Sequence, residues 1–232
     1  MKLGAYAFTY DDWREKDYPL DLWIEWHSKI FDSIVLVYVG DIYKLKGLEV
    51  PENVDILFVP YDRVKGRDYA FLKNLAQKSL KTEWKMLLDI DEFITERPRL
   101  RTSNIYIHNL FGDVYHEIIH KGVGEGKSVS GHVPWIRLYK GDRPVVKDGC
   151  TVIGEGFIHD PIEVYHTTLL RNPYELANRT GYWRINKKFD YSKWKEFWKD
   201  SIVKHVNPFS LPKILLDNSE RFEYCRNKRL LD

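Results

Sequence analysis

The sequence predicts an α/β fold with an open mixed sheet flanked by helices. The main observation is that apolar runs of strand length alternate with amphipathic stretches before residue 95. Continuous apolar runs are typical of buried parallel strands. Open α/β sheets bind ligands beyond the carboxyl ends of their strands, so functional residues are expected just after each run. The runs are Lys2 to Phe8, Ser33 to Val39, Val54 to Val59 and Trp84 to Ile90.

Helical periodicity fills the intervals between these runs. Apolar residues recur at helical spacing from Leu20 to Phe31, after a proline that suits a first helical turn, and again from Phe71 to Leu80. Beyond residue 95 the sequence predicts short strands between glycine-containing loops, at Val114 to His120, Val133 to Tyr139 and Ile162 to Thr167. Helical periodicity then returns. It predicts a helical extension over residues 176–232, packed on a main domain of residues 1–175.

Composition narrows the class of protein. The 232 residues are 44% hydrophobic with a formal net charge of +2, which opposes disorder and gives no general excess of positive charge for nucleic acid. Cys150 and Cys225 form no metal-ligand motif, which favours a reducing, cytoplasmic setting. No run approaches the length of a membrane span. A peripheral membrane contact through aromatic and basic side chains stays open, and the oligomeric state cannot be read from the sequence.

An acidic cluster follows the fourth apolar run. In an extended strand, Asp89 and Asp91 would point to one side and Glu92 to the other. Two carboxylates on one side can hold Mn²⁺ or Mg²⁺ together with phosphate oxygens and water. Alternatively, one carboxylate binds the metal and the other a ribose. A solvated acidic turn would give the same pattern.

The residues around this cluster resemble a known family. Lys73-Asn74-Leu75-Ala76, followed by Thr82 to Phe93, resembles the central block of family 2-like glycosyltransferases with the GT-A fold, including lipopolysaccharide-core-type enzymes. Trp135 to Lys140 and Tyr165-His166-Thr167 resemble later blocks of that family, in the same order. The resemblance covers about residues 1–175. It implies a GT-A-like catalytic domain with a Rossmann-like nucleotide-binding half.

The resemblance also implies roles for individual residues. Asp91 would bind the metal, and Asp89 would contact ribose or metal-bound water. Lys73 and Asn74 match an Arg-Asn pair near the donor. His166 would complete the metal shell or touch the pyrophosphate, unless it is a structural histidine. Arg171 would counter diphosphate charge, or it is a surface arginine.

Inverting sugar transfer needs a carboxylate that takes the proton of the acceptor hydroxyl. The resemblance points to Asp148 as this base, through a loose match of Val146-Lys147-Asp148 to a family segment. Glu155 and Asp160 are rival candidates, and a solvated Asp-Gly turn would also explain Asp148.

The first two strand ends depart from the family pattern. The chain has Phe8 to Asp12 where relatives have Asn-Glu, and Val39 to Ile42 where they have an Asp-rich segment. Asp41 is the best substitute for the carboxylate that meets the nucleobase. UDP-, GDP- and dTDP-sugars therefore all stay open as donors, with a glycan, lipid-linked or protein acceptor.

Two other functions compete with sugar transfer. His116-Glu117-Ile118-Ile119-His120 matches the zinc-protease pattern HExxH. Its surroundings favour a strand, and no third ligand follows at the expected spacing. The second alternative is a non-catalytic carbohydrate- or nucleotide-binding module, in which tryptophans such as Trp135 and Trp183 stack on sugars.

Overall fold

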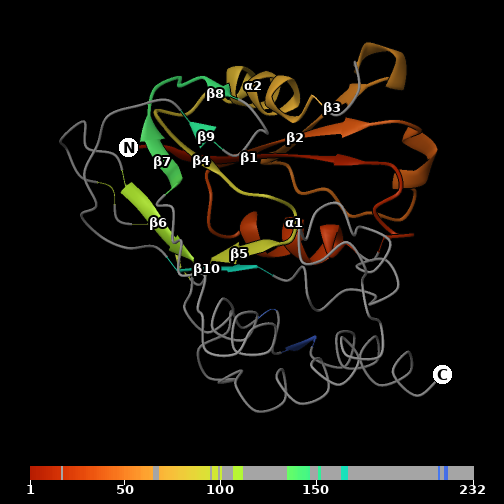
Figure 1. Ribbon diagram of the computed structural model, residues 1–232. Helices are drawn as coiled ribbons and strands as arrows, with labels where there is room; N and C mark the ends of the chain where they lie inside the picture. Colours follow the sequence, from red (N-terminus) through yellow and green to blue (C-terminus); the bar gives the residue numbers. More distant parts are fainter. Residues whose placement is uncertain are drawn as a thin grey trace, which may run out of the picture.

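The computed structural model describes residues 1–16, 18–64, 68–94, 96–98, 100, 107–111, 135–146, 151–152, 163–166, 214, 217 and 218. The chain alternates strands and helices through its first half and continues with short strands (Figure 1). In chain order, the elements of the described residues are β1 (Leu3–Tyr10), α1 (Leu20–His27), β2 (Ser33–Val39), the 3-10 helix η1 (Ile42–Leu45), β3 (Val54–Val59), the 3-10 helix η2 (Tyr61–Arg63), α2 (Tyr69–Ser79), β4 (Trp84–Leu87), β5 (Glu92–Ile94), β6 (Ile107–Phe111), β7 (Trp135–Lys140), β8 (Val145–Val146), β9 (Thr151–Val152) and β10 (Glu163–His166).

The main sheet is open and mixed, as the sequence predicts. Its strand order is β3-β2-β1-β4-β7-β6-β10-β5, and β8 pairs separately with β9. The first four strands of this order are parallel, whereas β7 is antiparallel to both of its neighbours. The predicted α/β fold with an open mixed sheet flanked by helices is therefore confirmed.

Most of the predicted elements agree with the observed ones. β2 and β3 have the predicted bounds, and α1, α2, β7 and β10 lie within or close to the predicted segments. The prediction for the fourth run is wrong at its end, because β4 stops at Leu87 and the chain turns at Ile90 and Asp91. The segment from Val114 to His120, which contains the HExxH pattern, lies outside the described residues. So does nearly all of the predicted helical extension.

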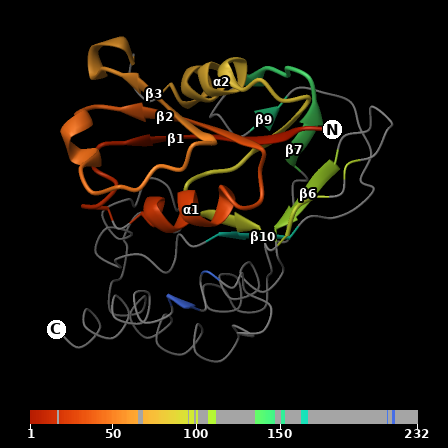
Figure 2. The ribbon, with the colours of Figure 1, turned by 180° about the vertical axis from the view of Figure 1, so that it is seen from behind.

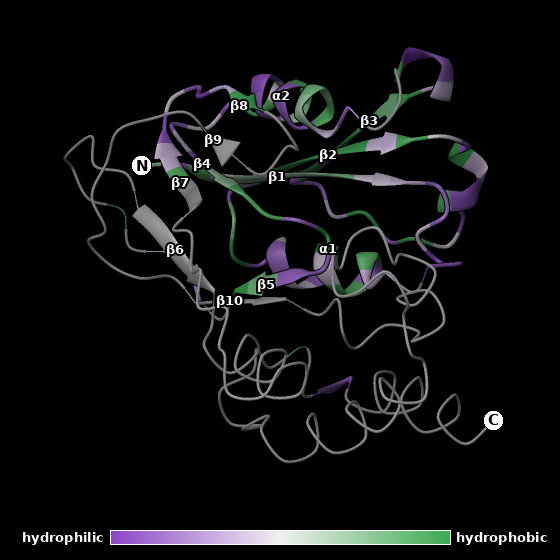
Figure 3. Cartoon of the chain, viewed as in Figure 1, coloured by the Kyte–Doolittle hydropathy of each residue, from purple (hydrophilic) through white to green (hydrophobic). Residues whose placement is uncertain are grey.

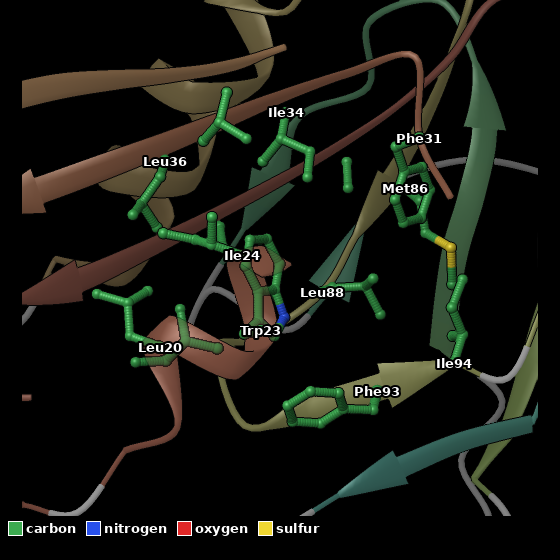
Figure 4. Close-up of a cluster of buried hydrophobic side chains, with 14 of the residues drawn as sticks. Leu20, Trp23, Ile24, Phe31, Ile34, Leu36, Met86, Leu88, Phe93 and Ile94 are labelled. Carbon is green, nitrogen blue, oxygen red and sulfur yellow. The ribbon is translucent and has the colours of Figure 1, made fainter. Parts of the chain in front are cut away.

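Two helices cover opposite faces of the parallel half of the sheet (Figures 1 and 2). On one face, Leu20, Trp23 and Ile24 of α1 pack against alternate residues of β1 and β2, together with Met86, Leu88 and Phe93 (Figure 4). On the other face, α2 covers the intervening residues of the same strands. The members of this second cluster include Tyr6, Val35, Val37, Leu72, Ala76 and Leu87. In Figure 3 these strands are mostly white to green, as their burial on both faces requires.

The chain between β4 and β5 bridges distant positions of the sheet. β4 is the fourth strand of the order and β5 the last, yet residues 88–91 alone connect them. Four residues reach at most about 18 Å between the flanking Cα atoms. The sheet must therefore curl so that β5 returns beneath β4, where it lies near α1 (Figure 1). Trp26 joins these elements, because its Nε1–H donates to the carbonyl of Ile94 at 2.7 Å.

A fully buried histidine lies at the contact between α1 and β5. The His27 ring is 4.7 Å from the Trp23 ring and 5.4 Å from the Phe93 ring between centroids. Its Nδ1 lies 2.9 Å from the Trp23 carbonyl, which selects the tautomer with a proton on Nδ1. Burial lowers the pKa of His27 from 6.5 to about 3, against a smaller opposing effect of that hydrogen bond. His27 is therefore a neutral core residue at neutral pH.

The low pKa of His27 makes the fold sensitive to acid. The unfolded chain takes up a proton near pH 6.5 and the folded chain only near pH 3, so acid favours unfolding within this window. We expect the free energy of unfolding to fall by up to about 1.4 kcal/mol per pH unit through this group. His27→Phe removes that contribution. Urea unfolding of both proteins between pH 7 and pH 4 measures the difference, and equal slopes would contradict this account.

Candidate functional site

The acidic segment after β4 forms a tight turn. The N–H of Glu92 donates to the Asp89 carbonyl at 2.9 Å, and Glu92 Oε2 accepts from the Asp89 N–H at 2.7 Å. Backbone groups of a buried turn need such partners. Asp89 and Asp91 therefore lie in a turn, so the expectation that they share one face of a strand is wrong. Glu92, which the sequence analysis gave no role, holds the turn closed.

Helix α2 places a lysine against this turn. Lys73 Nζ lies 2.6 Å from Asp89 Oδ1 and 5.6 Å from the centroid of the Phe8 ring. The Lys73 side chain is 2% exposed, whereas that of Asp89 is 31% exposed. The structure thus brings together two of the predicted donor-site residues. One is a buried cation, and the other is a carboxylate that reaches the surface.

The turn offers hard oxygen donors for a divalent cation. Asp91 is 4% exposed and follows Asp89 by two residues. Within the part of the chain that the structure describes, no three His, Cys, Asp or Glu residues gather into a ready metal cage. Mg²⁺ and Mn²⁺ at phosphate sites are held by one or two carboxylates, with phosphate oxygens and water completing the shell. The residues present fit such a site.

Strand β10 brings the backbone of His166 next to the acidic turn. β10 is antiparallel to β5, and His166 is the register partner of Glu92, one residue beyond Asp91. This pairing places the backbone of His166 near the acidic turn, and the role of its side chain toward a metal stays a prediction. Asp148, Arg171, Glu155 and Asp160 lie outside the described residues, so their predicted roles also stay predictions.

Two amide side chains of α2 bind the backbone of the segment that leads from β7 into β8. Asn74 Nδ2 donates to the Val145 carbonyl at 2.8 Å, and Asn74 Oδ1 accepts from the Val145 N–H at 2.9 Å. Gln77 makes the same pair of contacts with Arg143, at 2.5 and 2.6 Å. Asn74 and Gln77 are three residues apart on α2, and the two residues whose backbone they bind are two apart on an extended chain. Asn74 stands beside Lys73 in sequence, yet its amide is engaged by β8.

A second carboxylate, that of Asp11, links the carboxyl ends of β1, β2 and β3. Asp11 follows β1, is 8% exposed, and accepts hydrogen bonds from the Tyr61 hydroxyl and, at 2.9 Å, from the Asp41 N–H. Gly40 makes this approach possible. It has a φ of +119°, and a Cβ there would lie 2.5 Å from the Asp11 carboxyl group. The sequence analysis missed Asp11, whose signal was a carboxylate beside a glycine at adjacent strand ends.

Hydrogen bonding keeps Asp11 ionised. Burial by itself raises the pKa of Asp11, but the hydrogen bonds from Tyr61 and the Asp41 backbone, with the charge of Lys44, outweigh it and lower the pKa. Asp41, the predicted nucleobase contact, is exposed, and its carboxylate caps η1 by accepting from the Tyr43 N–H at 2.9 Å. Its contact with a base stays a prediction. The carboxyl ends of the parallel strands therefore carry both Asp41 and the acidic turn.

Fold and site together define an α/β protein with an acidic turn at the carboxyl end of its parallel strands. Among solved structures, the chain is similar to Staphylococcus aureus TarS, with 11% identity, a TM-score of 0.36 and coverage of 99% of this chain and 50% of that one. It is also similar to a manganese complex of Rv0371C from Mycobacterium tuberculosis H37Rv, with 13% identity, a TM-score of 0.31 and coverage of 39% of this chain and 51% of that one. The chain thus spans about half the length of each of these proteins.

The other comparisons give no match. No protein-family model matches the chain, and no curated protein matches it either. Over the described ranges, no helix is long and apolar enough to cross a membrane.

The contact of Tyr61 with Asp11 predicts a measurable effect on stability. We expect Tyr61→Phe to lower the free energy of unfolding by about 1 kcal/mol at pH 7, because a charged acceptor loses a donor. Since the pKa of Asp11 is lowered in the folded state, this contribution is lost as the pH falls through that lowered value. The matched control is Tyr43→Phe, at a tyrosine that is 84% exposed. Urea unfolding at pH 7 and pH 3 compares the proteins, and equal stability at pH 7 would refute the contact.

The amide contacts of α2 predict a second effect. We expect Asn74→Ala to lower the free energy of unfolding by about 1–3 kcal/mol, because both backbone groups of Val145 lose their partner. Lys78→Ala, at an exposed position of the same helix, serves as the control and is expected to change stability by less than about 0.5 kcal/mol. Thermal and urea unfolding measure both. Equal effects would mean that the Asn74 contacts contribute nothing.

Proposed function

We propose that the chain is a metal-dependent glycosyltransferase that moves a sugar from a nucleotide-diphospho-sugar to a glycan, lipid-linked or protein acceptor. One observation carries the proposal. The acidic turn with Asp89 and Asp91 lies at the carboxyl end of β4, within a parallel half-sheet of order β3-β2-β1-β4. That edge is where α/β sheets bind nucleotides. The resemblance of the surrounding residues to family 2-like glycosyltransferases supports the same function.

The chemistry assigns a task to each group. Asp91 would hold Mn²⁺ or Mg²⁺, with Asp89 binding it directly or through metal-bound water or else contacting the ribose, and the metal would neutralise charge on the departing diphosphate. The acceptor oxygen forms a bond to the anomeric carbon while the bond from that carbon to the diphosphate oxygen breaks. A carboxylate takes the hydroxyl proton, and Asp148 is our candidate ahead of Glu155 and Asp160. Inversion at the anomeric carbon follows from attack opposite to the leaving group.

The remaining predicted residues surround the donor in this proposal. His166 and Arg171 would approach the metal and the diphosphate, and Asp41 would meet the base. Support for His166 comes from the register of β10 with β5. A position at the sheet edge supports the role of Asp41.

A thermal-shift screen tests the proposal. UDP-, GDP- and dTDP-sugars are each added with and without Mn²⁺, and we expect one of them to raise the melting temperature by roughly 5 °C only when the metal is present. Asp91→Asn should abolish this shift. Asp55→Asn, at an exposed carboxylate of β3, should retain it.

Slow release of nucleoside diphosphate from the stabilising donor then distinguishes an enzyme from a binding module. We expect Asp148→Asn to keep the metal-dependent shift and to lose this hydrolysis. No metal-dependent stabilisation by any donor would refute the proposed function. Saccharide binding that ignores both the metal and Asp91 would identify a non-catalytic module instead.

A further inference from the structure

Lys73 and Asp89 form an asymmetric ion pair. The ammonium group is on a side chain that is 2% exposed, and its partner carboxylate is on one that is 31% exposed. Phe8 lies against the same ammonium, with 5.6 Å from Nζ to the ring centroid, and Phe8 itself stacks on Tyr69 at 5.1 Å. The buried cation therefore lies between the Phe8 ring and the Asp89 carboxylate. Among the residues that the structure describes, Asp89 is its ion-pair partner, and this carboxylate reaches the surface.

Burial makes this pairing costly to break. A buried ammonium that loses its carboxylate pays a desolvation penalty with no compensation. The Asp89 carboxylate therefore cannot turn toward another cation unless Lys73 finds a second anion. The turn supports the same geometry, because its closure by Glu92 fixes the backbone of Asp89.

A divalent cation at Asp89 would meet this ammonium at short range. Lys73 already occupies Oδ1 at 2.6 Å, so metal and lysine would share one carboxylate and repel each other. A diphosphate removes this conflict. Its oxygens can bind the metal and accept hydrogen bonds from the lysine at the same time.

We propose that Lys73 is a built-in counter-cation of Asp89 that opposes metal binding until a diphosphate arrives, so that metal binds together with the nucleotide. This inference rests on the proposed function, since it concerns the same metal and donor. It gives Lys73 a role apart from holding the donor. Lys73 acts through Asp89 and is in this respect a positioning residue.

The decisive measurement is the affinity for Mn²⁺ alone. We expect Lys73→Met and Lys73→Gln to bind Mn²⁺ about tenfold more tightly than the wild type in the absence of nucleotide, because the competing charge is gone. Free Mn²⁺ is quantified by its electron paramagnetic resonance signal. Lys73→Arg keeps the cation and should bind Mn²⁺ as weakly as the wild type. Two neutral variants are measured so that the test still gives a result if one of them does not fold.

A second buried lysine supplies the matched control. Lys85 lies at the beginning of the same β4 strand, with a side chain 5% exposed, and it pairs with Asp142, which is 64% exposed. Lys85→Met removes the same charge from a similar setting at a distance from the acidic turn. Its affinity for Mn²⁺ should stay within about twofold of the wild type, since the competition is local. In Lys73→Met/Asp89→Asn, the gain should disappear.

Addition of UDP, GDP or dTDP separates the two proposals. With the nucleotide that binds, the wild type should gain affinity for Mn²⁺ by at least tenfold, whereas Lys73→Met should gain much less. If the wild type binds Mn²⁺ with nucleotide but the neutral variants do not bind Mn²⁺ alone more tightly, the counter-cation role is wrong and the proposed function stands. If no protein binds Mn²⁺ or nucleotide, both proposals are wrong.

Discussion

The geometry of the candidate site depends on the short connection between β4 and β5, which consists of residues 88–91. The chain must leave a buried parallel strand and enter the last strand of a curled sheet, and it buries the turn in doing so. Buried backbone groups require partners. Glu92 supplies one by binding the Asp89 N–H, and its own N–H binds the Asp89 carbonyl. The position of Asp89 beside α2 follows from this closed turn.

Helix α2 connects that turn to the rest of the sheet. Lys73 contacts Asp89. Asn74 and Gln77 bind backbone groups of the segment that leads into β8. A shift of the helix would therefore disturb both the acidic turn and β8. The apolar side of α2 opposes such a shift, because Leu72 and Ala76 are fully buried against β1 and β2. Packing of an ordinary amphipathic helix thus determines the geometry of the polar contacts.

Local patterns predicted the elements but not the contacts between them. β2 and β3 were predictable to the residue because each is a continuous apolar run between turns. β4 was overestimated because Leu88 and Ile90 are apolar and buried without being in a strand. Their side chains fill the core from a turn, and hydropathy cannot distinguish the two cases. The partner of Asn74 lies 71 residues away, and no periodicity indicates a contact of that range.

The two carboxylates at the strand ends differ in how freely they can accept a ligand. Asp11 is 8% exposed and is held by a neutral hydroxyl and a backbone N–H, neither of which carries a positive charge. Releasing Asp11 would break both hydrogen bonds to its charged carboxylate, at a cost of about 1–3 kcal/mol for each. Asp89 is held by an ammonium group, which can exchange one anion for another without losing its charge compensation. A phosphate could therefore replace Asp89 at Lys73, and of the two carboxylates Asp89 is the one that suits the proposed metal and diphosphate site.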